Sequence, residues 1–215
     1  MPHSVCWSNS AMRIKGIRSR TSIALFCCLL LSVIYLTASP QHPYVHELFG
    51  PDLRISWPEG QKAHEDVMEL FYVGKYIPAL QKLERAISDV EQFSKTKEKD
   101  AAILLTTKAQ WLSLTGDTQA SDTAFLRAQS LAEPVLGTNH PVTARIQLIR
   151  AEVLLLRGDL PEAKAALERA IAAQAGHYGT NDVAFAMSLR LQAIVHLTEG
   201  DTGQARAHKP KFPNH

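Results

Sequence analysis

Residues 151–170 read AEVLLLRGDLPEAKAALERA, where Gly158 and Asp159 separate two apolar stretches. Glycine often ends a helix in the left-handed conformation, and aspartate is a favourable residue at the start of the next helix. Ala151 and Ala163 place small side chains on either side of the turn, where they allow two helices to approach to about 8–10 Å. The stretch therefore predicts two antiparallel helices joined by a short turn.

The same pattern recurs along the chain every 42 residues. The aligned columns are Gly74, Gly116, Gly158 and Gly200; seven residues earlier Val67, Ala109, Ala151 and Ala193; five later Ala79, Ser121, Ala163 and Ala205; nine later Leu83, Phe125 and Leu167; and twelve later Ala86, Ala128 and Ala170. Two columns of small residues lie seven positions apart, which is two helical turns, so they share one face. A fixed period with fixed apolar columns is typical of a solenoid.

The segments between the helix pairs also resemble one another. Residues 136–144 read LGTNHPVTA and residues 178–183 read YGTNDV. Each has a glycine to end one helix and polar residues to begin the next, with His140 expected to cap and Pro141 allowed in the first turn. Residues 95–100 read KTKEKD, depart from this motif, and are expected to form a solvated loop.

The glycine, alanine and large-residue columns resemble the tetratricopeptide repeat, and the 42-residue period with the LGTNHPVTA linker is similar to repeats of the kinesin light chain type. The resemblance covers residues 60–208 and implies an all-α, right-handed superhelical array of antiparallel helix hairpins. It implies three full repeats and a truncated fourth. A HEAT-like array, with a period of about 40–47 residues, remains the alternative.

The resemblance also implies a groove that binds another protein or a peptide. The paired asparagines that hold a peptide backbone in kinesin light chains are absent, because those positions hold Thr106-Thr107, Leu148-Ile149 and Arg190-Leu191. Specific cargo binding therefore does not carry over. Positions ten and six before each glycine lie four apart on one helix face and are the predicted groove contacts. They are His64, Met68, Thr106, Gln110, Leu148, Glu152, Arg190 and Ile194.

The N-terminal part of the chain predicts a membrane segment. Residues 1–21 hold four basic residues and no acidic one, and residues 22–38 form an uncharged apolar run. The positive-inside rule places residues 1–21 in the cytoplasm and the repeat domain on the other side, after a tether over residues 39–59. Retention of residues 22–38 as a single-pass anchor is favoured over cleavage, which would leave a secreted or periplasmic domain, and over burial as a soluble helix.

The residues after the tether do not form a recognisable catalytic set. His64 begins a sequence like that of a zinc-protease helix, but Met68 stands where the second histidine is needed. All three cysteines, Cys6, Cys27 and Cys28, precede the repeats, and no phosphate-binding loop follows them. The sequence predicts no enzyme, cofactor or metal site, and no basic footprint for nucleic acid.

The sequence therefore predicts an anchored helical-repeat scaffold for an unidentified protein or peptide. The alternatives are an assembly subunit that binds through the solenoid ends, or an accessory fragment of a larger protein. Pro210 and Pro213 break the pattern in the tail, residues 209–215. The preceding helix, with Phe185, Leu189, Leu191, Ile194, Val195 and Leu197, is expected to expose an apolar end that associates with itself or a partner.

Overall fold

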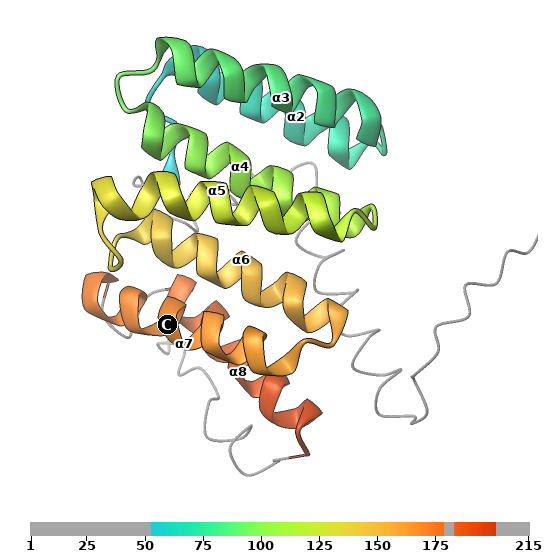
Figure 1. Cartoon of the computed structure of the whole chain (residues 1–215), viewed down its shortest axis with the longest axis vertical. Coiled ribbons are helices and arrows are strands. Elements are labelled where there is room, and N and C mark those ends of the chain that lie inside the picture. Colours follow the sequence, from blue (N-terminus) through green and yellow to red (C-terminus); the bar gives the residue numbers. More distant parts are fainter. Residues whose placement is uncertain (1–52, 179–182, 201–215) are drawn as a thin grey trace, which may run out of the picture.

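A computed structural model describes residues 53–178 and 183–200. These residues form helices and connecting turns, which confirms the all-α class for this part of the chain (Figure 1). The helices are α2 (Pro58–Tyr72), α3 (Tyr76–Phe93), α4 (Lys97–Leu114), α5 (Thr118–Leu136), α6 (Pro141–Arg157), α7 (Leu160–Tyr178) and α8 (Val183–Thr198). The predicted membrane segment at 22–38, Ala205 and the tail at 209–215 lie outside the described residues.

The helices stack as successive pairs along the long axis of the molecule (Figure 1). Helix α2 packs on α3, α4 on α5, and α6 on α7, while α8 packs on α7 and α6. The second helices of the three pairs begin at Tyr76, Thr118 and Leu160, which are 42 residues apart. The predicted repeat period is therefore the period of the structure.

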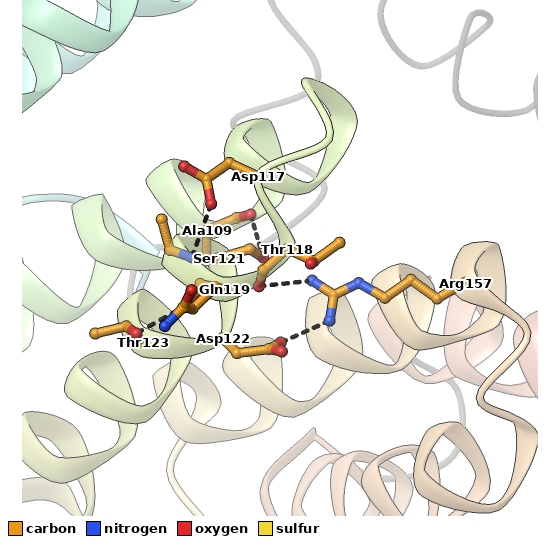
Figure 2. Close-up of polar contacts among 9 residues, drawn as sticks. Ala109, Asp117, Thr118, Gln119, Ser121, Asp122, Thr123 and Arg157 are labelled. Carbon is orange, nitrogen blue, oxygen red and sulfur yellow. Dashed lines mark hydrogen bonds and ion pairs between the residues drawn. The ribbon is translucent and has the colours of Figure 1, made fainter.

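The columns of small residues form the contact between the two helices of each pair. Ala109 and Ser121 are both fully buried, and the Ser121 hydroxyl donates a hydrogen bond of 2.7 Å to the Ala109 carbonyl oxygen (Figure 2). Ala151 and Ala163 are fully buried at the equivalent positions of the next pair. The prediction of a close helix approach at these columns is confirmed.

The turn glycines adopt the left-handed conformation that the sequence predicts. Gly116 and Gly158 have φ angles of 92° and 87°, a region that other residues rarely enter. The carboxylate of Asp117 then caps α5 by accepting a hydrogen bond of 3.0 Å from the backbone N–H of Ala120 (Figure 2). Lys75 holds that position in the first pair and makes no side-chain cap.

The linker motif acts as a helix start. The Nδ1 atom of His140 accepts a hydrogen bond of 3.1 Å from the backbone N–H of Val142, and Pro141 occupies the first turn of α6. Thr143 donates its hydroxyl to the Gly137 carbonyl oxygen at 2.9 Å, which closes the loop. The predicted capping role of His140 is confirmed.

The KTKEKD segment is the main departure from the predicted fold. Asp100 is not in a solvated loop: it lies in the first turn of α4 and its exposed fraction is 0%. Its carboxylate accepts hydrogen bonds from the backbone N–H groups of Ser56 and Trp57, at 2.9 and 3.3 Å, and from the hydroxyls of Ser94 and Thr96, at 2.7 and 3.2 Å. A buried carboxylate is tolerated because several donors replace its water.

These hydrogen bonds also change the predicted start of the domain. Helix α2 begins at Pro58, two residues before the expected boundary at residue 60. Ile55, which the sequence assigned to the tether, is 4% exposed and belongs to the hydrophobic core. The residues that follow Leu53 are therefore part of the folded domain.

Helix α8 is covered more fully than the sequence predicts. Leu191 and Val195 are each 1% exposed and pack in a cluster with α6 and α7, and Phe185 is 9% exposed. Leu189 and Ile194 are half-buried, and Leu197 is 43% exposed. Three of the six apolar side chains are thus covered, and the predicted apolar end and its association with itself or a partner stay a prediction.

Candidate functional site: the face of the first helices

The first helices of the repeats, α2, α4, α6 and α8, each carry half-buried side chains along one side. We call this the first-helix face and define it by His64 and Tyr72 of α2, Thr107 and Gln110 of α4, Arg145 and Glu152 of α6, and Arg190 and Ile194 of α8. In each helix these residues lie three, four, seven or eight positions apart, so they belong to one side of the helix. None of them comes from α3, α5 or α7.

Contacts between α2 and α4 build one end of the face. The Nε2 atom of His64 lies 3.3 Å from the hydroxyl oxygen of Thr107. Beside this pair, the rings of Phe71 and Trp111 stack with centroids 4.1 Å apart and an interplanar angle of 9°. Stacked aromatic side chains contribute about 0.5–1.5 kcal/mol beyond the area that they bury, so this stack helps to hold α2 against α4.

Charged side chains form the other end of the face. Glu152 of α6 interacts electrostatically with Arg145 on its own helix and with Arg190 of α8. Burial raises the pKa of Glu152, and the two guanidinium groups oppose that shift. Burial likewise lowers the pKa of Arg145, although Glu152 and Tyr72 act in the opposite direction. Arginine remains protonated at physiological pH, so the cluster holds two cations around one carboxyl group.

Tyr72 connects this charged cluster to the first repeat. Burial raises the pKa of its phenol, and Arg145 acts against that change. The two groups, one on α2 and one on α6, are therefore close enough for each to influence the ionisation of the other.

The eight predicted contact residues differ in burial and in the groups that they contact. His64, Gln110, Glu152 and Arg190 are half-buried on the first-helix face. Thr106 is buried and donates its hydroxyl to the Ala102 carbonyl oxygen at 2.7 Å within its own helix. Leu148 is buried in the hydrophobic cluster of the third repeat, and Met68 and Ile194 pack against hydrophobic clusters as half-buried side chains. Whether any of the eight touches a partner stays a prediction.

Sequence reasoning missed Tyr72, Thr107 and Arg145. These residues stand two, nine and thirteen positions before the turn glycine of their repeat, whereas the predicted contacts stand only six and ten positions before it. Together these positions mark one stripe along a helix with a spacing of three or four residues. Extending the predicted column by one turn in each direction would have included Tyr72 and Arg145.

Two ion pairs outside the first-helix face join consecutive repeats. Arg157 of α6 lies 2.7 Å from the carboxylate of Asp122 of α5 and also donates to the Thr118 carbonyl oxygen (Figure 2). Arg127 of α5 pairs with Glu91 of α3 in the same way. Exposed ion pairs contribute about 0.2–1 kcal/mol each, so they support the register of the stack more than its stability.

A hollow of about 460 Å³ lies between α4 and α5. Its lining includes Lys108 and Arg127, which are already paired with Glu84 and Glu91 of α3. Both cations are thus already paired within the chain, and the hollow is confined to a single helix pair. We therefore take the first-helix face as the candidate site.

The comparison with protein families agrees with this architecture. A family model described as tetratricopeptide repeat matches residues 100–176, and a second model with the same description matches residues 186–208. The matched residues are tetratricopeptide repeats. The matches cover α4 to α7 and run from within α8 to residue 208, while α2 and α3 have the same helix arrangement and period. No curated protein matches this tetratricopeptide repeat chain.

Two further observations concern only the described ranges, 53–178 and 183–200. Within them, no group of three or more histidine, cysteine, aspartate or glutamate side chains is arranged to hold a metal ion. The helices that they form are also too short or too polar to cross a membrane. The predicted anchor at residues 22–38 lies outside these ranges, so the observation on membrane-spanning helices does not apply to it.

Proposed function

We propose that this tetratricopeptide repeat protein is a scaffold that binds another protein or a peptide through the first-helix face. One observation carries the proposal: His64 of α2 lies 3.3 Å from Thr107 of α4, and Gln110, Arg145, Glu152 and Arg190 are half-buried polar side chains of first helices. Charged groups in partly buried surroundings interact more strongly than charges in bulk water. Such a cluster suits recognition of a polar segment, whereas stability alone would favour apolar residues at these positions.

Matched substitutions on the two sides of the stack test this proposal. Replacing Gln110 and Arg190 of the first-helix face by alanine should weaken partner capture by the full-length protein at least about tenfold, which corresponds to about 1.4 kcal/mol. The control replaces Gln92 of α3 and Arg169 of α7, both exposed, by alanine and should capture normally. Captured proteins are quantified by mass spectrometry. Equal capture by both double variants would refute the proposal and favour binding through the solenoid ends.

We further propose that residues 22–38 anchor the chain in a membrane with the repeats on the extracytoplasmic side. The charge asymmetry supports this orientation, because all four basic residues of positions 1–39 lie before the apolar run. Protease added outside intact cells or spheroplasts should digest the repeat domain. A domain that is protected until the membrane is opened would contradict the orientation, and a mature N-terminus near Ser39 would show cleavage in place of anchoring.

The similarity to kinesin light chain repeats is limited to the length of the repeat and to its linker. The positions of the paired asparagines hold Thr106-Thr107, Leu148-Ile149 and Arg190-Leu191, of which Thr106, Leu148, Ile149 and Leu191 are buried. Recognition through amide groups on both sides of a peptide backbone is therefore not part of the proposed function. Charge pairing at Arg145, Glu152 and Arg190 takes its place.

A further inference from the structure

An aromatic pair lies at the edge of the stack where the first helix pair joins the second. The ring centroids of Trp57 and Phe93 are 5.9 Å apart. Trp57 is half-buried, and Phe93, the last residue of α3, is 57% exposed. The α3–α4 and α5–α6 connections lie along this same edge, opposite the turns within the pairs (Figure 1). Apolar side chains that gather on a surface mark contact sites for proteins or membranes.

Basic side chains flank the aromatic pair along the chain. Lysine occupies alternate positions from the end of α3 into α4, and an arginine precedes Trp57 by three residues; the four are Arg54, Lys95, Lys97 and Lys99. Lys99 is half-buried and the other three are exposed. Among the described residues, no carboxylate forms an ion pair with any of the four. The neighbouring carboxylates that solvent reaches are those of Glu59 and Glu98, so four positive charges stand against two negative ones.

Asp100 holds the two segments of this edge together. Its buried carboxylate accepts hydrogen bonds from the backbone N–H groups of Ser56 and Trp57 and from the hydroxyls of Ser94 and Thr96. The first two donors belong to the segment before α2, and the other two belong to the connection between α3 and α4. The fold therefore fixes the backbone beside the aromatic pair and the lysines, which reduces the ordering that binding requires.

The chemistry of these side chains fits an anionic lipid surface. Three of the four basic residues are lysines, and lysine carries a compact charge on a flexible stem. Arginine is the residue that suits bidentate pairing with the carboxylate of a protein partner. Tryptophan and phenylalanine side chains bind at the headgroup level of a bilayer, and lysines beside them are attracted to anionic lipids.

We propose that this edge binds the anionic headgroups of a lipid bilayer. We call it the basic edge and define it by Arg54, Trp57, Phe93, Lys95, Lys97 and Lys99. The inference goes beyond the proposed anchor, because it assigns lipid contact to the folded domain itself. None of these six residues belongs to the first-helix face, so the lipid contact does not use the proposed partner site.

Photocrosslinking in intact cells tests the contact with the full-length protein. A photoreactive phenylalanine analogue replaces Phe93 in one variant and Leu126 in the control, because Leu126 is 59% exposed but lies in the middle of α5. Mass spectrometry should identify lipid adducts from position 93 at several times the yield from position 126. Adducts with protein in place of lipid, equal lipid yields from both positions, or no adduct from position 93 would overturn the proposal.

Charge substitutions test the role of the lysines in the same assay. The triple variant that should lower the lipid adducts from position 93 several-fold is Lys95→Gln, Lys97→Gln and Lys99→Gln. The control removes three exposed basic residues outside the basic edge and should leave the yield unchanged; it is Lys75→Gln, Arg85→Gln and Arg169→Gln. Equal yields from the two triple variants would contradict attraction by the lysines.

Reconstitution of the full-length protein tests the preference for anionic lipid. One set of vesicles contains phosphatidylcholine alone, and the other contains an equal amount of phosphatidylglycerol as well. Position 93 should give several-fold more lipid adducts in the second set, and high salt should remove the difference because it screens exposed charges. The same yield in both sets at low salt would refute an anionic lipid as the occupant of the basic edge.

Discussion

Replacing Asp100 by alanine should lower the free energy of unfolding by about 3–5 kcal/mol, one of the largest effects expected for a single substitution in this chain. The Asp100 carboxylate is fully buried and accepts four hydrogen bonds, two of them from the backbone of Ser56 and Trp57. Removing it leaves buried donors without an acceptor, and each such donor costs about 1–3 kcal/mol. The contributions are not additive, because all four donors share one group.

Urea unfolding of the full-length protein measures this effect. Asp89→Ala is the control, since Asp89 is exposed on α3 and its loss should change stability by no more than about 0.5 kcal/mol. Asp100→Asn should give an intermediate loss, because one acceptor oxygen remains. If Asp100→Ala and Asp89→Ala unfold at the same urea concentration, the described role of Asp100 is incorrect.

Phe125→Ala should cost about 3–5 kcal/mol as well, for a different reason. Phe125 lies on α5 in the column nine residues after the turn glycine and is 1% exposed in the main hydrophobic cluster. Truncation to alanine removes a buried aromatic ring and leaves a cavity in this cluster. Close packing of the neighbouring helices limits how far they can relax into that cavity.

The adjacent residue supplies a matched control for this substitution. Leu126 follows Phe125 on the same helix but is 59% exposed, so Leu126→Ala should be nearly neutral. Thermal and urea unfolding of both variants would establish the difference. A larger loss for Leu126→Ala than for Phe125→Ala would mean that the faces of α5 are assigned the wrong way round.

The repeat architecture was predictable because its signals are local and periodic. Gly158 ends a helix through its own backbone conformation, and Ala151 and Ala163 permit close packing through their own small size. His140 caps α6 by bonding to a backbone group two residues away. Each of these features depends on residues in one repeat, so a 42-residue pattern shows them three or four times.

The features that sequence reasoning missed depend on residues far apart in the chain. The sequence predicted Asp100 to lie in a charged loop. Its hydrogen-bond donors include the backbone groups of Ser56 and Trp57, which belong to the segment before α2 and are not apparent from the local pattern. Arg145 lies in the third repeat, but its positive charge acts to lower the pKa of Tyr72 in the first repeat. No local pattern identifies such pairs, because they are brought together only when the helices stack.

Crosslinking of a partner in intact cells is the most direct test of binding through the first-helix face. A photoreactive residue replaces Gln110 of α4 in one variant and Gln92 of α3 in the other, so both variants lose the same side chain. Gln110 is half-buried on the first-helix face, and Gln92 is exposed on an outer helix. We expect adducts with another protein from position 110 and none from position 92. Adducts with another protein from position 92 alone would contradict the account.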